Sequence, residues 1–165
     1  MIAFIGVGSN LGDRKATIDS ARQMLGRMPG VKMLRSSVIH ETEPVGGPPQ
    51  GPYLNAVWEV ETTLSAGELL DRFFQIEKKF NRFRTQRNAP RTLDLDLLFY
   101  GDSIIQQKGL TVPHPRLHER LFVLVPLMEL APDWVHPILN KTVRELIADL
   151  QPSQLGSVCP SAFVG

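Results

Sequence analysis

The chain has 165 residues with 18 Lys and Arg against 17 Asp and Glu, and 42% of its residues are hydrophobic. This length is typical of one domain with its own core, and the near-zero net charge argues against a protein that coats nucleic acid or an anionic membrane. The single cysteine, Cys159, excludes an internal disulfide, and no run approaches the roughly 20 apolar residues of a membrane span. We expect a soluble, cytoplasmic protein with a monomer as the default state.

The first half of the chain predicts three strands and one helix. Apolar runs and alternation predict strands over 2–8, 31–40 and 53–63. Asp13 is placed to open the helix, which carries one apolar stripe and stops at Pro29-Gly30. Residues 43–52 contain three glycines and four prolines and are therefore expected to form a loop.

The second half predicts further helices and one central strand. Ser65 and Glu68 have the spacing of a capping box, and an apolar stripe with helical spacing follows it as far as Phe83. A strand is expected over 92–100 and a short partner for it over 103–107. Helical pieces are expected around 117–131 with an interruption at Pro126, and a last helix from Thr142 to about 150.

This order of elements predicts an α+β fold, a ferredoxin-like sandwich in which helices pack on a mostly antiparallel sheet. Residues 1–150 are expected to form a single domain. Residues 151–165 contain no charged residue and are rich in Ser, Pro and Gly, so we expect a peripheral C-terminal tail.

Two aspartates give the strongest sign of chemistry. Along a strand over 92–98, Asp94 and Asp96 share one face while Leu93, Leu95 and Leu97 share the other. Adjacent carboxylates repel each other unless a cation lies between them. Carboxylates on a rigid strand suit Mg²⁺, which completes its shell with phosphate oxygens and water. An amphipathic strand whose polar face meets solvent explains the same pattern equally well.

The charge that precedes these aspartates favours the metal interpretation. Six of the 18 basic residues lie between Lys78 and Arg91, and guanidinium groups bind phosphate oxygens bidentately. A solvated helix end accounts for Lys78 and Lys79 but less well for the whole run. The sequence has no Gly-Lys pair, so any ATP site here is not a P-loop, and Gly6-Val-Gly8-Ser-Asn-Leu lacks the third glycine of a dinucleotide fingerprint.

Several motifs in this order resemble those of the 6-hydroxymethyl-7,8-dihydropterin pyrophosphokinase family. The resemblance covers about residues 2–150, and its most specific part is Pro90-Arg-Thr-Leu-Asp-Leu-Asp96 followed by Val112-Pro-His114. Other matching pieces are Gly8-Ser-Asn-Leu-Gly-Asp13, Tyr53-Leu-Asn-Ala56 and Arg120-Leu-Phe122. Asn88-Ala89 stand where the family usually has Trp-Gly.

The resemblance implies an ATP-dependent pyrophosphokinase that transfers the β,γ-pyrophosphate of ATP to the pterin hydroxymethyl group and releases AMP, in folate biosynthesis. It implies that Asp94 and Asp96 bind two Mg²⁺ ions, and that Arg82, Arg91 and Asp96 are catalytic. The residues implied for ATP are Glu77, Arg84, Thr111, His114 and Arg120. Those implied for the pterin are Thr42, Val45, Tyr53, Asn55 and Phe122.

The residues themselves are compatible with two other functions. A nucleic-acid-binding module could use the basic run before Arg91, but the following strand offers aspartates where RNA-binding sheets offer aromatic residues. A two-metal nucleotidyltransferase could use the same aspartates, and would release pyrophosphate rather than AMP. We expect small-molecule substrates and neither nucleic acid nor a membrane as a partner.

Overall fold

A single antiparallel sheet lies at the centre of the computed structural model, which describes residues 1–10, 13–42, 53–80, 93–150 and 158–160. The strand order is β5-β1-β4-β3-β8, and β2 also pairs with β4. These strands are β1 (Ile2–Ser9), β2 (Val31–Ser36), β3 (His40–Thr42), β4 (Tyr53–Thr62), β5 (Asp94–Tyr100) and β8 (Val158–Pro160). Every pairing between them is antiparallel.

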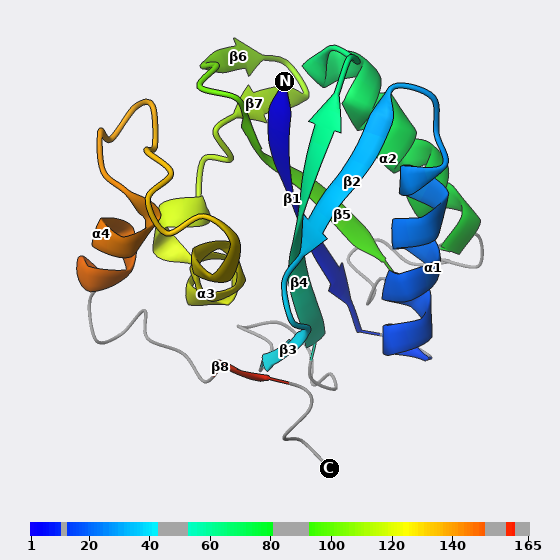
Figure 1. Ribbon diagram of the computed structural model, residues 1–165, viewed down its shortest axis with the longest axis horizontal. Helices are drawn as coiled ribbons and strands as arrows, with labels where there is room; N and C mark the ends of the chain where they lie inside the picture. Colours follow the sequence, from blue (N-terminus) through cyan, green and yellow to red (C-terminus); the bar gives the residue numbers. More distant parts are fainter. Residues whose placement is uncertain (11–12, 43–52, 81–92, 151–157, 161–165) are drawn as a thin grey trace.

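Helices cover both faces of this sheet (Figure 1). One face carries α1 (Arg14–Gly26) and α2 (Ala66–Phe80), and the other carries α3 (Leu121–Leu130) and α4 (Val143–Ala148). A short 3-10 turn, η1 (Leu117–Glu119), precedes α3. The sequence therefore predicted the fold class correctly.

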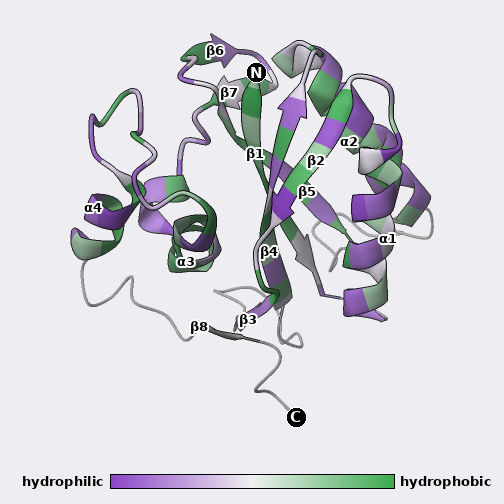
Figure 2. Ribbon diagram, viewed as in Figure 1, coloured by the Kyte–Doolittle hydropathy of each residue, from purple (hydrophilic) through white to green (hydrophobic). Residues whose placement is uncertain are grey.

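Two hydrophobic clusters follow from the alternation of side chains along the strands. Ile5 and Trp58 point to the α1–α2 side, where they pack with the buried stripe of α2. Phe4, Val57 and Leu98 point to the α3 side, where they pack with Leu124 and its neighbours. Helix α3 is hydrophobic along almost its whole length (Figure 2), because it lies between this face and α4.

Three helix starts predicted from the sequence are confirmed. The Asp13 side chain accepts a hydrogen bond from the Ala16 N–H at 3.2 Å. Before α2, the Ser65 hydroxyl and the Glu68 carboxylate each accept from the other residue's backbone N–H. Thr142 and Glu145 form the same reciprocal pair at the start of α4, so local capping chemistry fixes where these helices begin.

Other local predictions were wrong. The predicted strand over 31–40 is divided into β2 and β3. The segment over 103–107 does not pair with β5: strand β6 (Ile105–Gln107) forms a separate hairpin with β7 (Leu110–Val112). Pro126 lies inside α3 and does not interrupt it, although an interior proline removes one hydrogen bond and crowds the carbonyl four residues before it.

The predicted tail contributes to the sheet. Its residues Val158–Pro160 form β8, which pairs with β3 so that Thr42 lies opposite Val158 and His40 opposite Pro160.

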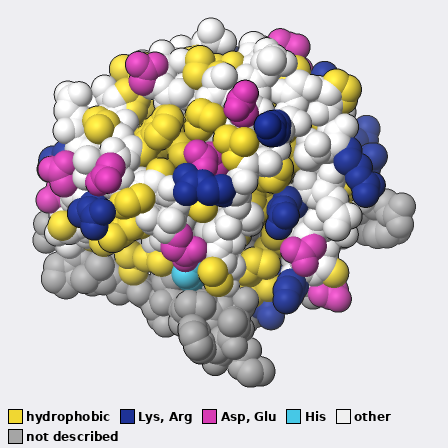
Figure 3. Space-filling view, viewed as in Figure 1, with side chains coloured by type: hydrophobic (Ala, Val, Ile, Leu, Met, Phe, Trp, Pro, Cys, Tyr) yellow, Lys and Arg dark blue, Asp and Glu magenta, His cyan; other side chains and the backbone are white. Residues whose placement is uncertain are grey.

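Within the described residues, no helix is both long and apolar enough to cross a membrane. On the face seen in Figure 3, charged side chains of both signs are interspersed with hydrophobic ones.

Candidate active site

One row of residues crosses the α3 face of the sheet and joins the two halves of the predicted site. Asp94 on β5 pairs with Gly8 on β1, Gly8 pairs with Asn55 on β4, and Asn55 pairs with His40 on β3. Directly paired residues of antiparallel strands project to the same face. The sheet register therefore places a predicted metal ligand and a predicted pterin ligand on one surface, with only a glycine between them.

The glycine in this row leaves space that the Asn55 side chain occupies. A Cβ atom added to Gly8 would lie 3.1 Å from Asn55 Oδ1 and 4.0 Å from Tyr53 Cδ1. The next outward-facing position on β1 is also a glycine, Gly6, which pairs with Asp96 on one side and Val57 on the other. The two glycines give β1 no side chains of its own opposite the two aspartates, and the Leu98 side chain lies over Gly6.

The aspartates differ in exposure, since Asp94 is partly buried and Asp96 is exposed. They lie two residues apart on one strand, a separation of about 7 Å along the chain. Among the described residues, no three His, Cys, Asp or Glu side chains gather as a metal site. This donor set fits Mg²⁺, because that ion commonly takes one or two carboxylates and fills its remaining positions with phosphate oxygens and water.

His114 and Arg120 lie near Asp96. The His114 backbone N–H donates to the Leu98 carbonyl of β5 at 3.0 Å, which holds this residue beside the strand. Its Nδ1 accepts from the Arg116 N–H at 3.2 Å, so the ring proton is assigned to Nε2. Burial lowers the pKa of His114, against the opposing attraction of Asp96. The ring can therefore act as a neutral donor through Nε2.

Arg120 occupies the N-cap position of α3. Burial, reinforced by Arg116, lowers the pKa of Arg120, and Asp96 opposes this shift. A guanidinium remains charged in proteins, so Arg120 is a partly buried cation near the aspartates. Its Cζ atom lies 5.7 Å from the centroid of the Phe122 ring, within the range of a cation–π contact. A predicted ATP ligand and a predicted pterin ligand therefore touch each other at the start of α3.

The remaining predicted residues that the structure describes lie on four different elements. Tyr53 and Asn55 are partly buried on the same face of β4. The backbone of Thr42 pairs with Tyr53 at the end of β3. Thr111 is exposed on β7. The Glu77 carboxylate, on α2, accepts a hydrogen bond from the Leu95 N–H at 2.9 Å, so it also holds the edge strand between the two aspartates.

Four predicted site residues lie outside the described residues: Val45, Arg82, Arg84 and Arg91. Their segments, 43–52 and 81–92, join the sheet where β4 begins at Tyr53 and β5 begins at Asp94. These strand starts belong to the end of the sheet at which Gly8, Asn55 and Asp94 pair.

Sequence reasoning did not identify the role of Gly8 or of His40. The alternation of Gly6 and Gly8 on one face of a strand was a usable signal, because it removes two consecutive side chains from that face. His40 carried no local signal, since its position in the row depends on the pairing of β3 with β4.

Comparison with known proteins points to one family. Residues 4–132 match the family model described as 7,8-dihydro-6-hydroxymethylpterin-pyrophosphokinase. A relative named 2-amino-4-hydroxy-6-hydroxymethyldihydropteridine pyrophosphokinase, from Synechocystis sp., is 40% identical over 99% of this chain and 83% of its own length. A relative of the same name from Bacillus subtilis is 44% identical over 78% of this chain and 77% of its own.

Longer proteins also contain a similar segment. The folic acid synthesis protein fol1 of Schizosaccharomyces pombe is 40% identical over 93% of this chain, which spans 21% of that protein. The crystal structure of Plasmodium falciparum HPPK-DHPS A437G superposes with a TM-score of 0.72 at 15% identity. The match covers 89% of this chain and 45% of that one, and it supports the fold.

Proposed function

We propose that the α3 face of the sheet carries out pyrophosphate transfer, because the chain belongs to the 7,8-dihydro-6-hydroxymethylpterin-pyrophosphokinase family, an ATP-dependent family of folate biosynthesis. The β,γ-pyrophosphate of ATP passes to the hydroxymethyl group of the pterin, and AMP is released. The observation that carries this proposal is the row Asp94–Gly8–Asn55, which places the metal-binding and pterin-binding candidates side by side.

Asp94 and Asp96 would hold two Mg²⁺ ions against the triphosphate. Bound Mg²⁺ would neutralise part of the phosphate charge and so favour attack by the pterin hydroxyl. Two carboxylates on one face of a strand, facing glycines on the neighbouring strand, fit this role. Asp96, the more exposed of the two, is also our candidate to accept the proton of the hydroxyl.

Basic side chains would bind the rest of ATP. His114 can donate from Nε2 to a phosphate oxygen, and Arg120 supplies a partly buried positive charge from the start of α3. We assign Arg84 to the same role, and Arg82 and Arg91 to the stabilisation of charge in the transition state. Glu77 and Thr111 are assigned to the nucleoside.

The pterin would lie over the glycine end of the sheet. Asn55 offers both amide donors and a carbonyl acceptor to the edge of a heterocycle. Phe122 would stack on the ring, with Thr42, Val45 and Tyr53 completing the pocket. In this proposal residues 1–150 form the catalytic domain, which acts as a monomer, and residues 151–165 form its C-terminal tail.

The decisive experiment compares two neighbours on β5. Asp96→Ala removes an exposed carboxylate and should abolish AMP formation from ATP, Mg²⁺ and the pterin alcohol, while the melting temperature without ligands holds or rises because a like-charge contact is relieved. Leu95 is only 5% exposed, so Leu95→Ala should cost about 2–5 kcal/mol of stability but leave activity per folded molecule nearly unchanged.

Ligand-dependent melting separates the same two variants. ATP with Mg²⁺ should raise the melting temperature of Leu95→Ala and do so far less for Asp96→Ala, because ligand stabilisation requires binding to the folded state. Near-normal turnover by Asp96→Ala would rule out the paired-aspartate site. ADP as the main nucleotide product would rule out pyrophosphate transfer.

A further inference from the structure

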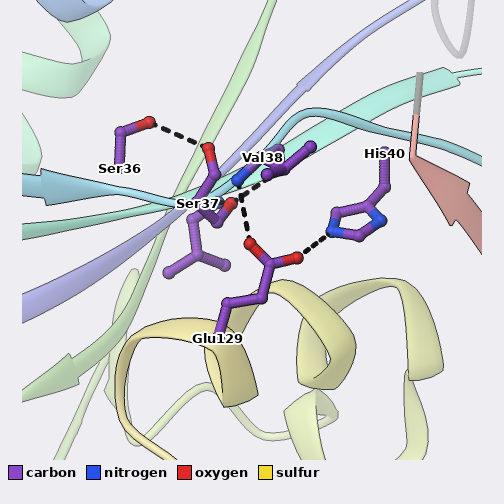
Figure 4. Close-up of polar contacts among 6 residues, drawn as sticks. Ser36, Ser37, Val38, His40 and Glu129 are labelled. Atoms are coloured by element: carbon purple, nitrogen blue, oxygen red, sulfur yellow. Dashed lines mark hydrogen bonds and ion pairs between the residues drawn. The ribbon is translucent and has the colours of Figure 1, made fainter. Parts of the chain in front are cut away.

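Three residues of the segment from β2 to β3 contact the C-terminal end of α3: Arg35 in β2, Val38 between the strands and His40 in β3. The guanidinium of Arg35 donates from Nη2 to the Leu130 carbonyl at 2.7 Å. The Val38 N–H donates to Glu129 Oε2 at 2.9 Å, and His40 Nε2 is hydrogen-bonded to Glu129 Oε1. Figure 4 shows the single Glu129 carboxylate reaching from the helix to both Val38 and His40.

Strand β3 needs such a contact to fix its register. It is only three residues long, and its pairing with β4 and β8 is made by the backbone. A slip of one residue would turn every side chain of a strand to the opposite face. The His40 side chain is buried, and its Nδ1 has no partner among the described residues. Since burial of a polar group is costly, its bond to Glu129 specifies one position for the strand.

The two elements joined by Glu129 carry opposite walls of the proposed pterin pocket. His40 lies beside Asn55 in the sheet, and Thr42 ends the same strand. Glu129 lies seven residues after Phe122 on α3, which is about 10 Å along a rigid helix. The position of the Glu129 end therefore determines where Phe122 sits over the sheet.

We propose that Glu129 and His40 are positioning residues for the pterin site: together they hold strand β3 and helix α3 at the separation that the pterin ring requires. This inference rests on the proposed function, because it takes Thr42, Asn55 and Phe122 as the pterin ligands. Neither Glu129 nor His40 is assigned a contact with substrate.

The test is a steady-state comparison of Glu129→Ala and Glu129→Gln with the unsubstituted protein, in which the KM values for the pterin alcohol and for ATP are measured separately. Glu129→Ala should raise the pterin KM about tenfold or more and leave the ATP KM within about twofold. Glu129→Gln retains an acceptor for the Val38 N–H and a polar partner for His40, so it should restore most of the pterin affinity.

Thr142→Ala serves as the matched control for lost stability. It removes the capping hydroxyl of α4, which accepts from the Glu145 N–H at 3.1 Å, and should lower the melting temperature by a few degrees with both KM values unchanged. If Glu129→Ala does not fold, His40→Phe provides the test, since it keeps an aromatic ring and loses the bond to Glu129. It should also raise the pterin KM selectively.

Three results would overturn the inference. These are an unchanged pterin KM in the variants that lose the bond, an equal rise in both KM values, and a rise in the pterin KM for Thr142→Ala that matches that of Glu129→Ala. Failure of the proposed function is recognised separately, because AMP formation by the unsubstituted protein and its loss in Asp96→Ala are measured in the same assay.

Discussion

Gly8→Ala tests whether the absence of a side chain at Gly8 sets the position of the Asn55 amide. The new methyl carbon would lie 3.1 Å from Asn55 Oδ1, closer than an ordinary carbon–oxygen contact, so the amide must move. Gly8 has an ordinary strand backbone without a positive φ, so alanine fits the chain there without strain. Stability should change little, because the flexible amide can shift and the alanine lowers the entropy of the unfolded chain.

The expected functional cost follows from one misplaced hydrogen-bonding group. Loss of a buried polar partner for the pterin corresponds to about 1–3 kcal/mol, which is about a 5- to 150-fold rise in the pterin KM. Gly6→Ala is the matched control for the pterin KM on the same face of the same strand. The atoms nearest its methyl would belong to the flexible Leu98 side chain, at 3.4 Å, and Gly6 pairs with Val57 rather than with Asn55. It should change the pterin KM by no more than about twofold.

A double-mutant cycle identifies the route of the effect. If Gly8→Ala acts by displacing Asn55, it should have almost no further effect on the pterin KM in an Asn55→Ala background. Full additivity of the two substitutions, or an unchanged pterin KM for Gly8→Ala alone, would refute the reasoning. The ATP KM, measured for the Gly8 and Asn55 variants, should stay constant throughout.

Two other predictions concern groups outside this row. Burial, with the nearby His118, lowers the pKa of His136. The unfolded chain therefore binds the proton more readily, and the stability of the fold should fall as the pH drops below about 6.5. His136→Asn keeps a side-chain acceptor for the turn, so its melting temperature should change less between about pH 7 and 5. Glu77→Ala should lower the free energy of unfolding by about 1–3 kcal/mol, because it leaves the Leu95 N–H of β5 without its partner. Urea unfolding should show that Glu77→Gln recovers most of this loss. Equal stability of both variants would contradict a role of Glu77 at the strand edge.

The sequence predicted those parts of the fold that are determined within a few residues of the chain. Capping side chains bond three residues away, and the apolar stripe of α2 repeats every three or four residues, so both were recognisable. The pairing of 103–107 was predicted wrongly because the turn was placed at Gly101-Asp102, before this segment, although its partner β7 follows it directly. The turn at Gly109, which has a positive φ of 80°, instead joins β6 to β7.

The candidate site was predictable as a set of residue types but not as a surface. The alternation around Asp94 and Asp96 predicted that both carboxylates share a face, and the sheet places them so. The alignment of Asp94 with Asn55 depends on two strand registers that no local pattern determines. The bond between His40 and Glu129 joins residues 89 positions apart, and an isolated glutamate near the end of a helix gave no sign of it.

The glycines of β1 and the Glu129 contact both follow from the location of the proposed site on a face of the sheet. Gly8 has no side chain and the proposed site needs open space above it, so α3 packs on the part of this face that Phe4, Val57 and Leu98 occupy. Apolar packing is not directional and leaves the tilt of a helix weakly defined when it covers part of a sheet. Hydrogen bonds are directional, and those from Arg35, Val38 and His40 act at the helix end farthest from Phe122. The N-terminal end of α3, which carries Phe122, is therefore positioned by hydrogen bonds at the C-terminal end of the same helix.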